Sequence, residues 1–273
     1  MQSDFKKLTL GFSPCPNDTF IFAALVHGRI DTGDIGFSEE ILADVETLNT
    51  WALAKKLDIT KISFSALGHV LQEYSLLPAG CALGRGCGPL LVAARPLSLT
   101  KDTVIGIPGR LTTAAMLLQL FHPECQKLVP LSFESIMPMV AAGELDAGVI
   151  IHESRFTYPL YGLSLVQDLG VWWEEQTGLP VPLGGIVARC DLGDDLHRQI
   201  AESIRASLRL AWAAPEKVMP YIVRHAQEME EKVIKAHIDL YVNDFTLDLG
   251  DEGKQAVDEF LSRGRAAGIL PPG

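Results

Sequence analysis

The sequence predicts an α/β protein with mostly parallel sheets, arranged in two lobes with a ligand cleft between them. Three observations support this prediction. Short apolar runs alternate with helix-forming segments up to about residue 190, an order typical of parallel strands joined by helices. The middle of the chain has a strand–helix series of its own. The residues after 194 show almost only helical periodicity.

The predicted strands are short runs rich in Val, Ile, Leu and small residues. They cover residues 8–12, 59–64, 88–94, 103–107, 128–133, 146–151, 163–166 and 185–188. The predicted helices carry apolar residues on one face. They lie ahead of residue 27, from residue 44, through 70–71, and over about 112–120, 134–142, 195–213, 216–228, 230–241 and 251–267.

Several of these helices have a residue at one end that is typical of a helix terminus. Asn17 or Asp18 is the expected N-cap of the first helix, because their side-chain oxygens accept free amide hydrogens. Asp44 is the expected N-cap of the second helix. Gly143 follows the helix over 134–142, and glycine readily adopts the left-handed turn that ends helices.

The chain is expected to cross between its two lobes near Arg95 and near Val187. The segment between these points has a β-α-β-α-β order, which predicts an inserted small lobe over residues 98–186. Residues 1–97 and 187–273 would together form the large lobe. Small-molecule sites often lie between domains, so the cleft between the lobes is the expected ligand site.

Composition and charge exclude several classes of function. The 273 residues carry a net charge of -11, without the clustered Lys and Arg that bind nucleic acid or anionic membranes. No apolar run reaches the length of a signal peptide or a membrane span, so we expect a cytoplasmic protein with a small-molecule ligand. The five cysteines include no CxxC pair, which argues against a zinc knuckle or a thioredoxin-like redox motif.

A predicted buried strand ends at His152, in the stretch AGVIIHESRFTY over residues 147–158. Ligands of open α/β sheets bind just outside the carboxyl ends of strands, and imidazole changes its protonation near neutral pH. Two interpretations follow. Either His152 transfers a proton in the cleft, or it only ties down the loop at the end of the strand.

The stretch PGRLTTAA, over residues 108–115, places Thr112 and Thr113 at the start of a helix that follows a strand and a turn. Free backbone amides and the helix dipole favour an anion at such a position. Either threonine is therefore a candidate to hold a carboxylate. The alternative is that one of them acts only as an N-cap.

Two cations occur in unusual surroundings. Lys61 lies within the apolar strand ITKIS, which makes it a candidate site residue or an edge lysine that discourages aggregation between strands. Arg85 lies in the glycine-rich stretch ALGRGCGP, which lacks the spacing of phosphate- and dinucleotide-binding loops. We expect a tight loop beside the cleft, with Arg85 as a candidate anion contact.

Long segments of the chain together resemble the 1,4-dihydroxy-6-naphthoate synthases of the futalosine route to menaquinone. These segments are SPCPNDTF, DVETLN, ITKIS, ALGRGCGPL, PGRLTTA, IIHESRFTYP, DLGVWWEEQTGLPVPLG and AHIDLYVNDFTLDLG. The resemblance covers nearly the whole chain. It implies the two-lobed, type II fold of periplasmic solute-binding proteins, in agreement with the inserted lobe predicted above.

The resemblance also implies a reaction and the residues that perform it. The reaction would be a lyase conversion of cyclic dehypoxanthinylfutalosine to 1,4-dihydroxy-6-naphthoate, with loss of a fragment derived from the ribose. His152 would be the proton acceptor. The substrate-binding residues would be Thr60, Lys61, Ile62, Ser63, Thr112 and Thr113.

The implied chemistry is consistent with these residue types. The substrate is an anionic spiro compound that bears a carboxylate, and removal of one proton triggers loss of the sugar-derived part while the new ring becomes aromatic. We expect neither a metal nor an organic cofactor, because a base, a carboxylate anchor and a closed cleft are sufficient. The alternative is a non-catalytic solute-binding protein for a small carboxylate, since a shared fold does not distinguish binding from turnover.

Overall fold

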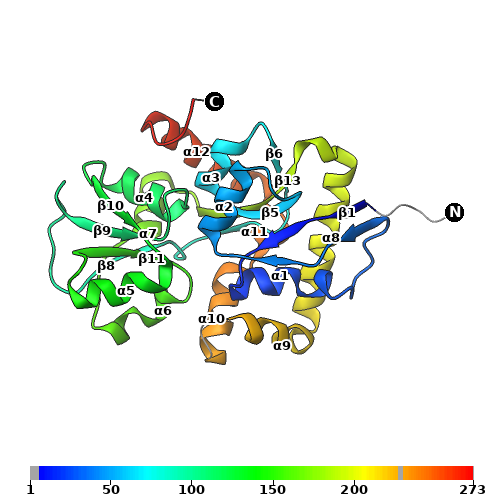
Figure 1. Cartoon of the computed structure of the whole chain (residues 1–273), viewed down its shortest axis with the longest axis horizontal. Coiled ribbons are helices and arrows are strands. Elements are labelled where there is room, and N and C mark those ends of the chain that lie inside the picture. Colours follow the sequence, from blue (N-terminus) through cyan, green and yellow to red (C-terminus); the bar gives the residue numbers. More distant parts are fainter. Residues whose placement is uncertain (1–5, 227–229, 273) are drawn as a thin grey trace.

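The computed structural model describes residues 6–226 and 230–272, which form two main sheets flanked by helices (Figure 1). The six-stranded sheet has the order β4 (Ile41–Leu42), β2 (Leu10–Phe12), β5 (Ile59–Ser63), β13 (Val181–Arg189) and β6 (Tyr74–Leu76), with β7 (Ala82–Gly84) also paired to β13. The five-stranded sheet has the order β10 (Lys127–Pro130), β9 (Val104–Ile107), β11 (Ala147–Ile150), β8 (Leu90–Ala93) and β12 (Ser164–Asp168). A separate pair is formed by β1 (Lys6–Leu8) and β3 (Ile35–Phe37).

The α/β class is confirmed, but the sheets are mixed rather than mostly parallel. Strand β2 runs parallel to β4 and β5, and β9 runs parallel to β10 and β11. Strand β13 runs antiparallel to β5, β6 and β7, and β8 runs antiparallel to β11 and β12. With β8 the chain enters the five-stranded sheet, and with β13 it returns to the six-stranded one. Because each of these two strands follows a connection from the other sheet, no helical crossover forces it to run parallel to its neighbours.

The strand pairing also differs from the predicted lobe boundaries. Strand β8, at Leu90–Ala93, belongs to the five-stranded sheet although it precedes the predicted boundary at residue 98. Strand β13 starts at Val181 and pairs with β5, ahead of the predicted boundary at residue 187. The chain thus crosses before each of these strands, so both ends of the inserted sheet lie closer to the N-terminus than predicted.

The helices cover the sheets on both sides (Figure 1). They are α1 (Pro16–Val26), α2 (Val45–Leu53), α3 (Phe64–Val70), α4 (Thr113–Phe121), α5 (Phe133–Ala142), α6 (Ser154–Thr157), α7 (Leu169–Thr177), α8 (Asp194–Ala213), α9 (Pro215–His225), α10 (Glu231–Tyr241), α11 (Asp244–Leu247) and α12 (Gly250–Ala266), with short 3-10 turns at Tyr158–Tyr161 and Cys190–Leu192. The predicted helical tail is confirmed, and the predicted helix end at residue 228 lies outside the described residues. No described helix is long and apolar enough to cross a membrane.

The predicted helix ends are mostly confirmed. Asp44 caps α2 by accepting the backbone amides of Glu46 and Thr47, each at 3.0 Å. Gly143 ends α5 with a left-handed φ of 77°. The expected cap of α1 is wrong, because α1 begins at Pro16 and proline has no amide hydrogen to satisfy. Asp18 instead accepts hydrogen bonds from Ser13.

Helix α1 is buried along nearly its whole length, as its apolar composition on all faces predicts. It packs against α8 through a shared hydroxyl. The Ser207 hydroxyl donates to the carbonyl of Ile21 at 2.6 Å and accepts from the amide of Leu25 at 3.1 Å. This packing holds the second half of α1, and the opposite, N-terminal end of the helix carries polar residues that line a cavity.

Candidate active site

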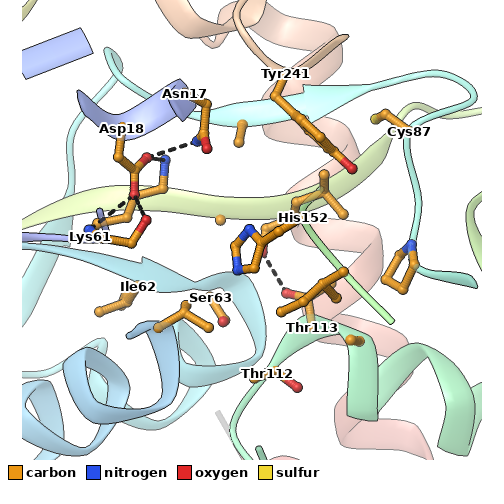
Figure 2. A pocket seen from close by; sticks show the side chains of 18 of the residues that line it. Asn17, Asp18, Lys61, Ile62, Ser63, Cys87, Thr112, Thr113, His152 and Tyr241 are labelled. Atoms are coloured by element: carbon orange, nitrogen blue, oxygen red, sulfur yellow. Dashed lines mark hydrogen bonds and ion pairs between the residues drawn. The ribbon is translucent and has the colours of Figure 1, made fainter. Parts of the chain in front are cut away.

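A cavity of about 680 Å³, open to solvent, is lined by residues from both sheets and from α10 (Figure 2). The six-stranded side contributes strand β5 and the residues around the start of α1. The five-stranded side contributes the start of α4 and the end of β11. An adjoining hollow of about 1430 Å³ shares part of this lining. Six of the seven predicted site residues line the cavity: Lys61, Ile62, Ser63, Thr112, Thr113 and His152.

Thr60 is the predicted site residue that the structure places elsewhere. Its side chain is completely buried, and its hydroxyl donates to the carbonyl of Lys61 at 3.1 Å. It lies beside Gly11 of the neighbouring strand β2. Thr60 therefore packs the sheet beneath the cavity instead of lining it.

Lys61 is a buried central-strand residue, so the edge-lysine interpretation is wrong. Strand β5 lies between β2 and β13, and the Lys61 ammonium forms an ion pair with Asp18 at 3.0 Å (Figure 2). The ammonium also donates to the carbonyl of Gly80 at 3.1 Å, and the Ser13 hydroxyl donates to the second carboxylate oxygen of Asp18 at 2.7 Å. The charge of Lys61 is thus balanced within the protein, as a buried cation requires.

The two threonines have different contacts. Thr112 is the N-cap of α4: its hydroxyl accepts from the amide of Ala115 at 3.2 Å and donates to the carbonyl of Gly109 at 2.8 Å. The hydroxyl of Thr113 donates to the carbonyl of Leu183 at 2.7 Å, which links α4 to β13. Both hydroxyl hydrogens are therefore used within the protein. The remaining amides of the first turn of α4 are the donors available to an anion.

His152 lies immediately beyond strand β11, at the wall shared by the cavity and the adjoining hollow. Its φ of 57° is left-handed, a conformation that is uncommon for residues other than glycine and often occurs at functional sites. The ring nitrogen Nδ1 lies 3.3 Å from the sulfur of Cys15. The ring also contacts Phe133 edge-on, with 5.0 Å between the ring centroids.

The surroundings of His152 favour the neutral imidazole. Burial lowers its pKa from 6.5 to about 4, and Lys61 adds to the lowering while the carboxylate of Asp18 opposes it. Sequence reasoning assumed an ordinary pKa near neutral pH. The half-buried ring in the structure is instead unprotonated at neutral pH, which is the form that can accept a proton.

Cys15, His152 and Glu153 form the one cluster of metal-type ligands found within residues 6–226 and 230–272, with ligand atoms within 4.8 Å of one another. Thiolate, imidazole and carboxylate are typical zinc ligands. However, burial and the nearby Glu153 carboxylate raise the pKa of the Cys15 thiol well above its ordinary value. Without a metal the thiol is therefore protonated, and it lies within hydrogen-bonding distance of the His152 ring, at 3.3 Å.

The comparison with known proteins identifies the family. A family described as menaquinone biosynthesis matches residues 8–266 of the chain. The chain belongs to this family. A relative from Thermus thermophilus is 52% identical over 267 residues, covering 97% of this chain and 96% of the relative. A relative from Streptomyces coelicolor is 43% identical over 272 residues, covering 97% of this chain and 95% of the relative. Both are named 1,4-dihydroxy-6-naphthoate synthase, so this member of the family is a biosynthetic enzyme and the predicted resemblance is confirmed.

Solved structures confirm the predicted type of fold for this menaquinone-biosynthesis enzyme. A protein from Archaeoglobus fulgidus superposes with a TM-score of 0.92 at 33% identity, covering 97% of this chain and 98% of that protein. The periplasmic aliphatic sulphonate binding protein of Escherichia coli superposes with a TM-score of 0.66 at 11% identity, covering 97% and 89%. At that identity the second likeness concerns the fold alone.

The cavity residues of the menaquinone-biosynthesis enzyme that sequence reasoning did not assign to the site include Asn17, His237 and Tyr241. The His237 Nε2 donates to the Asn17 side-chain oxygen at 3.0 Å. The Asn17 amide donates to Asp18 at 2.9 Å (Figure 2). His237 and Tyr241 are four residues apart on α10, so they share one helix face. That spacing was the only signal in the sequence, and it equally describes a core face.

The expected anion contact at Arg85 is wrong. The Arg85 guanidinium is exposed, forms an ion pair with Glu252 at 2.9 Å and donates to the carbonyl of Gly178 at 2.9 Å. It does not line the cavity. The arginine nearer to His152 is Arg155, which binds Asp168 at 2.7 Å and the carbonyl of Gly88 and so ties the loops of the five-stranded sheet together.

Proposed function

We propose that this enzyme is a lyase that converts cyclic dehypoxanthinylfutalosine to 1,4-dihydroxy-6-naphthoate. The observation that carries the proposal is a neutral imidazole, His152, in the wall of a cavity lined from both sheets. The names of the two relatives support the product. An elimination started by a base explains why a histidine with this protonation state lies at the site.

In this proposal His152 removes the proton that starts the elimination. Burial favours the unprotonated ring before the step. The imidazolium that forms is stabilised by the anionic substrate beside it, so bound substrate raises the pKa of His152. In the tautomer whose Nδ1–H donates to the sulfur of Cys15, Nε2 is the nitrogen that accepts the proton.

The substrate carboxylate would bind at the start of α4. Thr112 and Thr113 fix the first turn there through bonds to Gly109 and Leu183. The backbone amides that this first turn leaves unpaired would be the donors to the anion. Ser63 is a further donor, because its hydroxyl oxygen accepts from the Asn49 amide at 3.1 Å and its hydrogen remains available. These groups would hold the anion while His152 acts on the ring.

The leaving group is the fragment derived from the sugar. Loss of the proton and of this fragment makes the second ring aromatic, which supplies the driving force without an electron acceptor. The proposed chemistry therefore needs a base, an anchor for the carboxylate and exclusion of water from the cleft.

The direct test is to incubate the purified protein with cyclic dehypoxanthinylfutalosine and to follow 1,4-dihydroxy-6-naphthoate by chromatography and mass spectrometry. We expect stoichiometric formation of the naphthoate with no added metal or redox cofactor, also after treatment with a chelator. Tight binding of the cyclic compound without product would instead support the solute-binding alternative and contradict the proposal.

A further inference from the structure

The Tyr241 hydroxyl is a polar group in the cavity that the base and the carboxylate anchor leave unused. Tyr241 is the last residue of α10, only 8% of its surface is exposed, and it lines the cavity together with His152. Figure 2 shows its phenol extending from the helix into the space framed by the labelled side chains. Within residues 6–226 and 230–272 its hydroxyl has no hydrogen-bond partner, and its main-chain carbonyl accepts from Thr246.

The phenol is held in place by the residues behind it. Its ring packs against His237, one helical turn earlier, with 4.6 Å between the ring centroids. His237 is 1% exposed and is bound to Asn17 at 3.0 Å, and Asn17 is bound to Asp18 at 2.9 Å. These contacts link the end of α10 to the start of α1. The hydroxyl is therefore positioned before any ligand enters, which is what a preorganised donor requires.

The hydroxyl remains protonated throughout the physiological pH range. Burial is the main reason that the pKa of Tyr241 rises well above its ordinary value. The Cys87 thiol and the carboxylates of Glu153 and Asp168 raise it further, whereas the Arg155 guanidinium lowers it. A buried phenol that stays protonated and lacks a protein acceptor can donate a hydrogen bond to a ligand.

We propose that Tyr241 is a second catalytic residue, whose hydroxyl donates a hydrogen bond to a ring oxygen of the substrate that becomes negatively charged in the reaction. This inference rests on the proposed function. The product carries ring hydroxyls at positions 1 and 4, so a ring oxygen is available to take up charge. The proton moves to His152, the electron pair of the broken C–H bond enters the ring system, and charge develops on that oxygen until the sugar-derived fragment leaves with an electron pair. Tyr241 donates a hydrogen bond during this step and transfers no proton.

The variant Tyr241→Phe removes the hydroxyl alone and tests the inference. Loss of one preorganised donor to an oxyanion typically lowers kcat by about 10²- to 10³-fold, and we expect a decrease in that range. The melting temperature should stay unchanged, because the hydroxyl bonds to no described protein group. A purely structural hydroxyl would give the opposite result: a lower melting temperature with wild-type kcat per folded molecule.

Tyr74→Phe is a matched control within the same chain. The Tyr74 side chain is 1% exposed, lies outside the cavity lining and donates to the carbonyl of Leu57 at 2.5 Å. Its loss should lower the melting temperature by about 2–4 °C and leave kcat unchanged. Wild-type turnover with an equally active Tyr241→Phe variant would overturn this inference and leave the proposed function intact. A wild-type protein that does not form the naphthoate would overturn the proposed function and the inference with it.

Discussion

The buried ion pair between Asp18 and Lys61 allows a quantitative prediction about how the cavity wall is held. The two charges lie 3.0 Å apart, and 7% of the Lys61 side chain and 3% of the Asp18 side chain are exposed. Two unit charges at that distance attract each other by about 5 kcal/mol at an effective dielectric constant of 20. Both groups lost their hydration on folding, so the pair contributes little net stability, whereas either charge alone would be costly.

Asp18→Asn leaves the Lys61 ammonium buried without its counter-ion. Breaking a buried pair in this way costs about 3–5 kcal/mol of unfolding free energy, and the Ser13 hydroxyl also loses a charged acceptor. Urea titration should show this loss, with a melting temperature lower by roughly 10 °C. Adding Lys61→Met should restore most of the stability, because no unpaired charge then remains.

An exposed pair provides the control for this measurement. Lys127 and Asp102 are a similar 2.9 Å apart, but 53% and 67% of their side chains are exposed. Asp102→Asn should therefore change the unfolding free energy by only about 0–1 kcal/mol. If Asp18→Asn loses no more than this control, or if Lys61→Met does not restore stability, the reasoning about burial is refuted.

Three further predictions concern the cavity and its walls. Burial lowers the pKa of His152 from 6.5 to about 4, so kcat/KM should fall only as the pH approaches 4; a break near 6.5 in the pH–rate profile would contradict this. The unfolded chain binds the His152 proton more readily in that window, so the contribution of His152 to stability is complete above pH 6.5 and is lost as the pH falls toward 4. The Glu46 carboxylate accepts the Leu111 amide at 3.1 and 3.2 Å, joining α2 to the loop before α4. Glu46→Ala should therefore increase the radius of gyration of the ligand-free protein in small-angle scattering, whereas a change at the exposed Glu39 should not; equal values for both variants would exclude Glu46 as a tie between the halves.

Local sequence patterns predicted the features that depend on neighbouring residues. Asp44 was found as a cap because its partners lie two and three residues away. His152 was found because an apolar run ends directly before it. The threonine pair was found because a proline–glycine turn precedes it. In each case the deciding contacts lie within a few residues of the chain.

The remaining features depend on contacts between distant segments. Asn17 and His237 are joined by a hydrogen bond across 220 residues, and a buried helix face gives no sign of it. Lys61 was taken for an edge or site lysine because its partner, Asp18, lies on another element. The direction of β13 is set by the return of the chain between sheets, which periodicity does not encode. Strands as short as β4, with two residues, are too brief for an alternation pattern.

We propose His152 as the general base of the reaction. His152→Asn keeps a hydrogen-bonding side chain beside Cys15 but cannot accept the proton. Positioned general bases typically contribute about 10²- to 10⁴-fold to the rate, so turnover should fall within that range. The exposed His69, which lies outside the cavity lining, gives the matched control: His69→Asn should keep wild-type turnover.

The decisive measurement is the single-turnover rate of naphthoate formation with cyclic dehypoxanthinylfutalosine, compared between wild type, His152→Asn and His69→Asn at equal amounts of folded protein. We predict a loss of at least about 10²-fold for His152→Asn alone, with equilibrium binding of the substrate retained. A His152→Asn variant that forms the naphthoate at nearly the wild-type rate would rule out His152 as the general base and show that the proton has another acceptor.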